Sequence, residues 1–290
     1  MRRALAERGH GVIGVDLPGR GAEIEQDLAD PGLDAGALAR RVGPVGGIIH
    51  LAARITRGSS VDAGARRNLR AIAEAPVLLS EAWRAQHGPL HVVFCSTLKV
   101  YGAGIRGAID PVATPLHPEP RSYGCAKALA ERLLATAARR AGFSLAVVRP
   151  TYIYGTGQAA HNAIPIFLAA CWRGEPPVVF GERGQELRDD VHVSEVAASL
   201  VAACLRRAEG PFNSAGERVR TLIEVAQLCC DAVAAAGGPA GLHPLCDPNL
   251  PPKPWVDQSF DATRTHDLLG VTATPMLARL TEQAAAMRTS

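Results

Sequence analysis

The stretch HVVFCS, from His91 to Ser96, decides the fold of this chain. Its apolar residues are consecutive and two of them are β-branched, so both faces of the strand that it predicts must be buried. A strand buried on both faces is typical of a parallel sheet that helices cover on each side. Three similar stretches occur in the chain: GVIGVD at 11–16, GGIIHL at 46–51 and SLAVVR at 144–149.

Helical patterns separate these strands, near residues 60–86 and 123–141. Because strands alternate with helices, we predict an α/β fold with a doubly wound parallel sheet. The strand at 11–16 follows a helical segment, Arg2–Arg8, that has no strand before it. The first strand of the alternation is therefore expected to be missing. Residues 1–150 should form this large domain, and residues 151–290 should form a smaller region.

The second half of the chain is less regular, since proline-rich segments interrupt it and short helices mix with isolated strands. We predict that Ser194 is the N-cap of a helix with Glu195 in its first turn. Thr221 and Glu224 form a T-x-x-E pattern, which predicts a capping box at the start of the next helix.

The composition is that of an ordinary globular protein, with 47% hydrophobic and 20% charged residues. A net charge of +3 from scattered basic residues argues against a nucleic-acid partner. No apolar stretch approaches the ~20 residues that cross a bilayer, and the N-terminus lacks the apolar region of a signal peptide. Seven cysteines without a C-x-x-C pair argue against a disulfide framework or a metal site. Reduced thiols in a cytoplasm are the prediction.

The strongest chemical signal is YGCAK, in which Tyr123 and Lys127 lie four residues apart at the start of a predicted helix. Side chains at this spacing share one face of a helix. An ammonium near a phenol favours the phenolate and should bring its pKa, ordinarily near 10, toward the working pH. Tyr123 is therefore a candidate general base for a hydroxyl proton. The alternative is an accidental pair, which chance produces in a few per cent of such chains.

Hydroxyl residues end the predicted strand that begins at His91, at the edge of an open α/β sheet where ligands bind. There, Thr97 could donate a hydrogen bond to the reacting oxygen while Tyr123 takes its proton. A Ser-Thr pair at a strand end is more often a loop cap, and only the pairing with Tyr123 and Lys127 favours catalysis. Of the 31 basic residues, only Lys99, Lys127 and Lys253 are lysines.

Five motifs together resemble the extended short-chain dehydrogenase/reductase superfamily, in order and in spacing, over nearly the whole chain. They are HLAA (50–53), CSTLKVYG (95–102), PRSYGCAK (120–127), RPTYIYGTGQ (149–158) and LRDDVHVSEVA (187–197). The resemblance is to NAD-dependent epimerases and dehydratases of nucleotide sugars. It implies a Rossmann-like dinucleotide-binding domain over residues 1–150 and a mainly substrate-binding region over 151–290.

The resemblance also implies site residues. Thr97, Tyr123 and Lys127 would be the catalytic triad, and Lys127 would also hold the ribose of the nicotinamide. The other implied cofactor contacts are Asp16, Asp27, Leu28, Leu51, Ala52, Ala53 and Pro150, together with Tyr123. The implied substrate contacts are Thr97, Tyr152 and Arg188. For Arg188, the alternative is a structural ion pair with Asp189 or Asp190.

Asp16 indicates which dinucleotide to expect. A carboxylate at this strand end accepts both hydroxyls of the adenosine ribose and repels a 2′-phosphate, so NAD is preferred to NADP. Arg20 lies close enough in the sequence to weaken this preference.

The chain departs from the family pattern at four places. The phosphate-binding glycine loop, ~20 residues before the ribose-binding acid, would have stood before Met1, and a start site recorded too far downstream is the expected explanation. Leu98 and Lys99 replace the Asp-Glu pair of the dehydratases, which disfavours dehydration. Tyr152 replaces an Asn that touches the substrate. Lys253 lies where an Arg usually clamps the diphosphate.

Two classes of function remain open on the sequence. The favoured one is an NAD-dependent epimerase or reductase that acts on a secondary alcohol or ketone of a sugar-like small molecule, such as a nucleotide sugar. The other is a non-catalytic relative that binds a dinucleotide or a partner protein and has lost the phosphate loop. A small-molecule substrate is expected, no nucleic-acid or membrane partner is expected, and a homodimer is left open.

Overall fold

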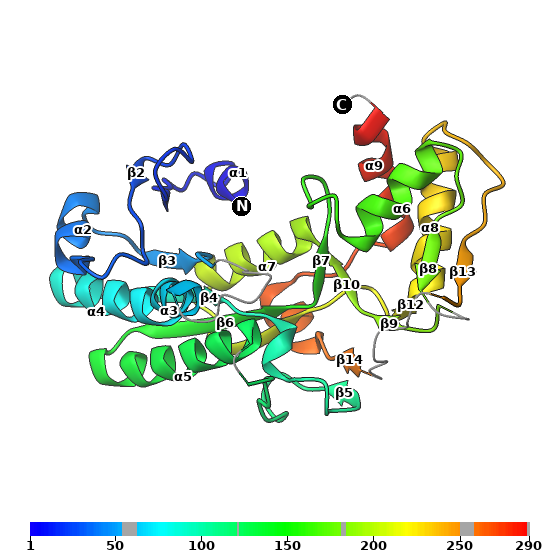
Figure 1. Cartoon of the computed structure of the whole chain (residues 1–290). Coiled ribbons are helices and arrows are strands. Elements are labelled where there is room, and N and C mark those ends of the chain that lie inside the picture. The colour runs from blue at the N-terminus through cyan, green and yellow to red at the C-terminus, as the bar shows by residue number, and fades with distance from the viewer. Residues whose placement is uncertain (54–62, 121, 181–183, 250–257, 289–290) are drawn as a thin grey trace.

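The computed structural model describes residues 1–53, 63–120, 122–180, 184–249 and 258–288 (Figure 1). Its central element is a parallel sheet of four strands in the order β11-β6-β4-β3. These strands are β3 (Gly47–His50), β4 (His91–Cys95), β6 (Ser144–Pro150) and β11 (Gly210–Ser214). The doubly wound parallel sheet predicted from the alternation of strands and helices is confirmed.

Successive residues of β4 point to opposite faces of the sheet, and both faces are covered. Val92 and Phe94 belong to the core beneath α2 (Ala35–Val42), α4 (Ala75–His87) and α5 (Tyr123–Ala141). Val93 belongs to the core beneath α7 (Val193–Leu205). All three side chains are fully buried, and burial of each contributes about 1.5–3 kcal/mol to folding.

Local interactions define both ends of helix α5. The Ser122 side chain accepts a hydrogen bond from the Cys125 amide at 3.1 Å, which caps the N-terminus. At the other end, Gly142 adopts the left-handed conformation that terminates many helices, with φ of 74°. Between these caps the sequence is rich in alanine and leucine, which are strong helix formers.

The N-terminal segment lies beside the large sheet without joining it. Helix α1 (Arg2–Ala6) contacts α7, and β1 (Val15–Asp16) pairs in parallel with β2 (Ile24–Glu25) as a separate two-stranded sheet. The strand predicted over 11–16 is therefore correct only for its last two residues. Within the described residues, β3 is an edge strand, since β4 is its only hydrogen-bonded neighbour.

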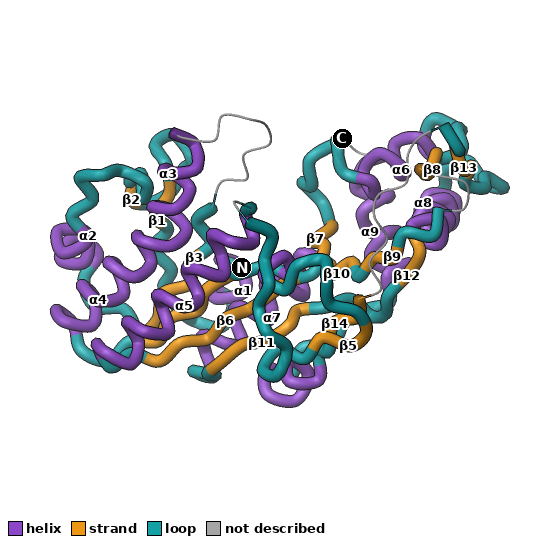
Figure 2. The backbone as a smooth tube through the Cα atoms, turned by 60° about the horizontal axis from the view of Figure 1, so that its bottom comes forward, coloured by secondary structure: helices purple, strands orange, loops and turns teal. Residues whose placement is uncertain are grey.

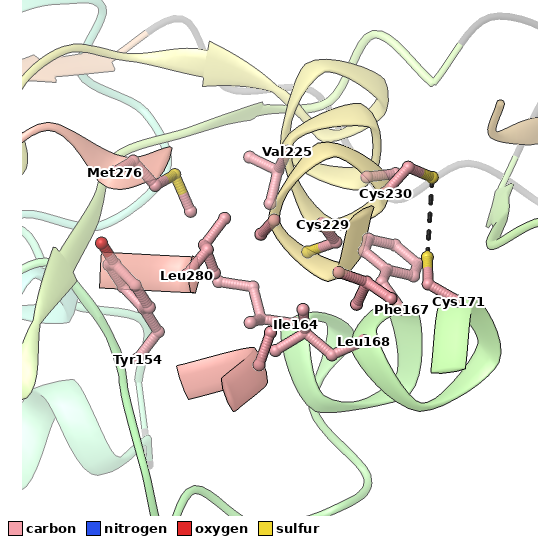
Figure 3. Packing of buried hydrophobic residues seen from close by; sticks show 14 of the residues in the cluster. Tyr154, Ile164, Phe167, Leu168, Cys171, Val225, Cys229, Cys230, Met276 and Leu280 are labelled. Atoms are coloured by element: carbon pink, nitrogen blue, oxygen red, sulfur yellow. Dashed lines mark hydrogen bonds between the residues drawn. The ribbon is translucent and has the colours of Figure 1, made fainter. Parts of the chain in front are cut away.

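A second region gathers beyond the carboxyl ends of the large sheet (Figures 1 and 2). Its core lies among α6 (Ala163–Trp172), α8 (Leu222–Ala235) and α9 (Met276–Arg288), as Figure 3 shows. Its short strands pair as β7 (Tyr152–Tyr154) with β10 (Asp190–His192), β8 (Val178–Phe180) with β13 (Leu245–Asp247), and β9 (Leu187–Arg188) with β12 (Arg220–Thr221).

The remaining elements are short. One long helix contains α3 (Ala63–Leu69), a π-helical turn η1 (Arg70–Glu74) and α4. The 3₁₀ turn η2 (Leu98–Val100) follows β4, and the π-helical turn η3 (Thr265–Leu269) precedes α9. Strand β5 (Gly107–Ile109) pairs with β14 (Gln258–Phe260).

Two expectations for the second half need correction. Helix α7 and strand β11 return to the large sheet, so residues 193–214 do not belong to the smaller region and the division at residue 150 is not a clean cut. The N-cap of α7 is His192 and not Ser194, because the His192 side chain accepts from the Ser194 amide while Glu195 accepts from the His192 amide. The capping box at Thr221 and Glu224 is confirmed.

No helix in the described part of the chain is both long and apolar enough to cross a bilayer. The described residues contain no cluster of three or more side chains arranged to hold a metal ion. All seven cysteines are free thiols.

Candidate active site

The predicted catalytic residues meet at the carboxyl edge of the large sheet. Thr97 follows β4, and Tyr123 and Lys127 occupy the first two turns of α5, which packs on the same strands. In open α/β sheets, this edge is where ligands bind. The structure therefore brings together side chains from two separate motifs of the sequence.

Lys127 is the most constrained member of this group. Its side chain is 1% exposed, and Nζ donates a hydrogen bond of 2.6 Å to the backbone oxygen of Cys95, the last residue of β4. The same ammonium lies 4.5 Å from the ring centroid of Phe94 and 5.7 Å from that of Tyr123. Aromatic faces attract a cation at these distances. Lys127 thus ties α5 to the end of β4.

Gly124 allows α5 to approach the loop that carries Thr97. A Cβ atom at Gly124 would lie 2.4 Å from the backbone oxygen of Lys99, which is too close for any side chain. Thr97 begins η2, where its Oγ1 accepts from the Lys99 amide at 3.4 Å. The glycine between Tyr123 and Lys127 therefore has a structural reason, which is to bring Thr97 close to the start of α5.

The ionisation of this pair differs from the expectation. Burial lowers the pKa of Lys127 to about 8, from an ordinary value of 10.5. Burial also raises the pKa of Tyr123, and the neighbouring Cys95 adds to this increase. The prediction that Lys127 lowers the pKa of the phenol is wrong for this state of the site, because Nζ is held by the Cys95 carbonyl instead of standing beside the phenol oxygen.

The residues predicted to line a cofactor cleft lie in three groups. Leu51, Ala52 and Ala53 follow β3, where Leu51 is 45% exposed, and Pro150 is buried at the end of β6. Asp16 ends β1 with an exposed carboxylate whose Oδ1 accepts from the Leu17 amide at 2.7 Å.

Asp27 and Leu28, expected to border an adenine, follow β2. The Asp27 carboxylate is already engaged by Arg67 of α3 and by the Ala29 amide. Leu28 is half-buried against the core beneath α4 and α5. Asp27 and Leu28 therefore have contacts within the protein that do not depend on a bound ligand.

A bound dinucleotide needs partners for its two riboses and for its pyrophosphate. Lys127 and the exposed Asp16 carboxylate suit the two ribose ends, because an ammonium and a carboxylate can hydrogen-bond vicinal hydroxyls. The pyrophosphate requires a glycine loop between a strand and a helix. The pattern G-x-G-x-x-G occurs at Gly102–Gly107, but there the chain runs into β5 and not into a helix. The described residues therefore fit the ribose ends and do not supply this loop.

Tyr152 and Arg188, the predicted substrate residues, contact one another. The Arg188 guanidinium lies 4.6 Å from the ring centroid of Tyr152. It also donates to Asp190 twice, from Nε at 3.0 Å and from Nη2 at 2.7 Å. The ion pair with Asp190, considered from the sequence, is thus present. It orients the guanidinium, and among the described contacts Nη1 has no acceptor.

Asp189 has a separate, structural position. It accepts hydrogen bonds from the Thr151 hydroxyl at 3.1 Å and from the Gly216 amide at 2.7 Å. Burial raises its pKa to about 6. Lys253, the residue expected where an Arg clamps a diphosphate, lies outside the described residues.

Sequence reasoning missed a buried polar network below the site. Glu131 follows Lys127 by one turn of α5, and it forms two hydrogen bonds with Arg149 of β6, at 2.6 and 3.1 Å. Ser96 also donates to Glu131. All three residues are at most 6% exposed. The spacing of four residues from Lys127 was a signal for Glu131, whereas no local pattern pointed to its partners.

The sequence and the fold of the chain both match known proteins. Residues 1–215 match the NAD dependent epimerase/dehydratase family. The chain therefore belongs to the NAD-dependent epimerase/dehydratase family, whose cofactor is NAD, and it has the Rossmann-type fold of the extended short-chain dehydrogenases.

Among individual proteins, the chain is similar to UDP-glucose 4-epimerases and to a further protein solved with a UDP-sugar and NAD. It is 25% identical to the UDP-glucose 4-epimerase of Thermotoga maritima, solved with UDP-glucose, with a TM-score of 0.77 over 99% of this chain and 94% of the other. It is 26% identical to MoeE5 in complex with UDP-glucuronic acid and NAD, with a TM-score of 0.75 over 99% and 94% of the two chains.

A UDP-glucose 4-epimerase of Vibrio cholerae is 28% identical over 118 residues, which are 41% of this chain. That alignment spans 35% of the length of the Vibrio cholerae protein.

Proposed function

We propose that this protein is an NAD-dependent epimerase of a nucleotide sugar, and that it acts on a secondary hydroxyl of the sugar. The observation that carries the proposal is the fully buried Lys127, which Cys95 O holds at 2.6 Å one helical turn from Tyr123 and beside the strand end of Thr97. Burying an ammonium is costly unless it is paired and hydrogen-bonded, and burial lowers the pKa of Lys127. Family membership and the similar UDP-sugar epimerases support the same activity.

In this proposal each side chain has a separate role. In its ionised form, the phenolate of Tyr123 takes the proton of the reacting hydroxyl and returns it at the end of the reaction. Thr97 donates a hydrogen bond to the same oxygen. Lys127 holds a ribose of the cofactor and favours the ionised phenol once a bound ligand draws the ammonium away from Cys95 O. Bound NAD supplies the acceptor and donor of the hydride. The configuration at that carbon would be inverted if the oxidised sugar presented its other face to the cofactor before the hydride returned.

The substrate region is consistent with a diphosphate. Arg188 stacks on Tyr152 and is oriented by Asp190, and its free Nη1 can donate to a phosphate oxygen. An arginine whose plane is fixed on both sides loses less side-chain entropy when it binds an anion. Dehydration is not part of the proposal, since Leu98 and Lys99 stand in place of an acidic pair.

The test is inversion of configuration on defined substrates. The chain is incubated with NAD and, separately, with UDP-glucose, UDP-glucuronic acid and UDP-N-acetylglucosamine, and proton NMR of the sugar follows the configuration of each carbon. The proposal expects one of the three to reach an equilibrium of two epimers without net loss of NAD. Stoichiometric conversion of NAD to NADH would instead indicate a dehydrogenase or reductase.

A non-catalytic role is the second candidate, because the described residues do not supply a phosphate-binding glycine loop. The same incubation distinguishes the two. Saturable binding of NAD or UDP-glucose in a calorimeter, with no epimerisation over a day, would favour a binding protein and contradict the catalytic proposal.

Replacing Asp16 by Asn tests the proposed choice of NAD over NADP. The exposed carboxylate at the end of β1 should repel a 2′-phosphate, and this repulsion is lost in the neutral amide. We expect the ratio of the dissociation constants for NADP and NAD to fall by about tenfold, which is roughly 1.4 kcal/mol. Asp34→Asn, at the N-cap of α2, is the matched control for charge. An unchanged ratio would mean that Asp16 does not contact the ribose.

A homodimer is also proposed, through the exposed leucines of α4 and α5. Leu78, Leu129 and Leu133 are 46%, 42% and 39% exposed on two helices that pack side by side. Apolar residues concentrated on one face often mark an interface. We expect Leu129→Lys together with Leu133→Lys to convert the dimer into a monomer in sedimentation experiments. A wild-type chain that sediments as a monomer would contradict the proposal.

A further inference from the structure

The buried network of Glu131 lies beneath the candidate active site and connects three elements that build it. Glu131 is on α5, the helix of Tyr123 and Lys127. One carboxylate oxygen accepts from the Ser96 hydroxyl, directly after β4. The other accepts from Arg149 Nη2 at 2.6 Å, on β6. A single carboxylate therefore joins the helix to the ends of the two central strands.

Ser96 lies directly between two residues that contribute to the site. The residue before it, Cys95, provides the carbonyl that holds Lys127 Nζ, and the residue after it is Thr97. The Ser96 amide also donates to Val148 O at 2.7 Å. Its backbone and its side chain are thus fixed separately, the first by β6 and the second by Glu131. Any displacement of Ser96 moves the Lys127 acceptor and Thr97 together.

Arg149 is held as firmly as Ser96. Besides the two bonds to Glu131, its Nη1 donates to the Tyr101 hydroxyl at 2.8 Å and to Pro111 O at 2.9 Å. The Tyr101 hydroxyl in turn donates to Asn213 Oδ1 on β11 at 2.6 Å. In such a dry environment, a hydrogen-bonding group that loses its partner costs about 1–3 kcal/mol. The network should therefore keep the strand ends in one arrangement.

We propose that Glu131 and Ser96 are positioning residues for the Thr97, Tyr123 and Lys127 site. Glu131 holds Ser96 in place, and Ser96 places both the carbonyl that anchors Lys127 and the hydroxyl of Thr97. Neither residue touches the substrate. The catalytic part of this inference rests on the proposed function, whereas its effect on Lys127 does not depend on any substrate.

The charge of Glu131 also acts on Lys127. Glu131 raises the pKa of the Lys127 ammonium, against the larger lowering caused by burial. The other titratable groups that face this ammonium are Cys95 on β4, Tyr123 on α5 and His50 on β3. Burial lowers the pKa of His50 to about 4, so His50 is neutral at pH 7. Glu131, which forms an ion pair with Arg149, is the one carboxylate among these groups.

The first experiment removes only the link between Glu131 and β4. Ser96→Ala keeps the Glu131–Arg149 pair, so the fold and the KM of the nucleotide sugar should be unchanged, while kcat should fall about tenfold as Thr97 and Lys127 lose their alignment. Ser96→Thr, which restores a hydroxyl, should recover most of the kcat. The matched control is Ser80→Ala, a fully buried serine of α4 that bonds only Pro76 O. A wild-type kcat in Ser96→Ala, or a loss equal to that of Ser80→Ala, would overturn the inference.

The second experiment does not need a substrate. A chain labelled with ¹³Cε-lysine gives signals from only three lysines, and Lys127→Met assigns the signal of interest. The Lys127 signal should titrate with a midpoint near pH 8 in the wild type. In Glu131→Gln the midpoint should move to lower pH, because the ammonium loses the electrostatic attraction of the carboxylate. An unmoved midpoint would show that Glu131 does not act on Lys127.

These two measurements separate the inference from the proposed function. If no nucleotide sugar is converted, the proposed function fails, and the Lys127 titration still tests Glu131. If Glu131→Gln does not fold, because Arg149 loses its anion, Ser96→Ala remains as the variant that keeps the pair intact. In that variant, the Lys127 signal should still change its midpoint relative to Ser80→Ala, since only the pairing with β6 then holds the strand end that carries Cys95 O. Identical midpoints would contradict the positioning role.

Discussion

Replacing Tyr123 by Phe should lower kcat by about 10²–10⁴-fold, which is the usual contribution of a general base. The phenol is half-buried at the start of α5, and its ring packs against the core beneath that helix, so Phe preserves the packing and removes only the hydroxyl. The measurement is the rate of epimerisation of the nucleotide sugar that the wild type converts.

The control for this variant is Tyr154→Phe. Tyr154 is buried in the core of α6, α8 and α9, which is not the core against which Tyr123 packs, and loses the same hydroxyl. It should keep the wild-type kcat, and both variants should retain the wild-type melting temperature within a few degrees. A loss of less than tenfold in Tyr123→Phe would mean that another group is the base.

Replacing Lys127 by Met should abolish turnover and change how stability depends on pH. An unfolded lysine keeps its proton up to about pH 10.5, whereas the buried Lys127 loses it near pH 8. Between these values the unfolded state binds more protons, so the free energy of unfolding of the wild type rises with pH. The difference of about 2.5 between the two pKa values of Lys127 corresponds to roughly 3 kcal/mol in the free energy of unfolding. As the pH rises from below 8 to above 10.5, the free energy of unfolding of the wild type should increase by this amount relative to that of the Met variant.

Urea denaturation of both chains at pH 7 and at pH 10.5 measures this difference. Lys127→Arg provides the complementary variant, since it keeps a positive charge at every pH used. The guanidinium is bulkier than the ammonium and cannot be placed in the closed space at Cys95 O, so turnover should also be lost. Parallel pH curves for the wild type and Lys127→Met, or full turnover in Lys127→Arg, would refute the role assigned to Lys127.

The sequence predicted the parts of the fold that depend on local patterns. The bounds of α5 follow from the Ser122 cap, a run of helix formers and Gly142, and the apolar runs of β3, β4 and β6 are continuous. Each of these signals lies within a few residues of the element that it defines.

Strand β11 could not be predicted in the same way. Its sequence, GPFNS, has no β-branched residue and contains Pro211, which cannot donate to a sheet. It is a strand because β6 leaves one edge free, and an edge strand tolerates a proline. The bonds of Glu131 with Ser96 and Arg149 depend in the same way on tertiary structure, because they join residues of three different elements.

Tyr123 and Lys127 lie near one another, whereas the predicted lowering of the pKa of the phenol is wrong. Spacing places Tyr123 and Lys127 on one face of a helix. Only the three-dimensional structure shows that Cys95 O draws the ammonium away from the phenol, since that carbonyl belongs to a strand 32 residues earlier.

The return of β11 to the sheet has a consequence for folding. The partner of β6 is synthesised some 60 residues after it, and α7, which covers one face of β4 and β6, also comes from this later part of the chain. A nascent chain that has emerged only as far as β6 therefore exposes Ala146 and Val148 to water, together with one open strand edge. The chain between β6 and α7 contains α6 and the four short strands β7, β8, β9 and β10, so this whole segment separates the strands that must pair to complete the sheet. Folding of this protein is consequently dominated by contacts distant in sequence, which predicts slow folding, cooperative loss of both regions on heating, and a chaperone requirement during synthesis.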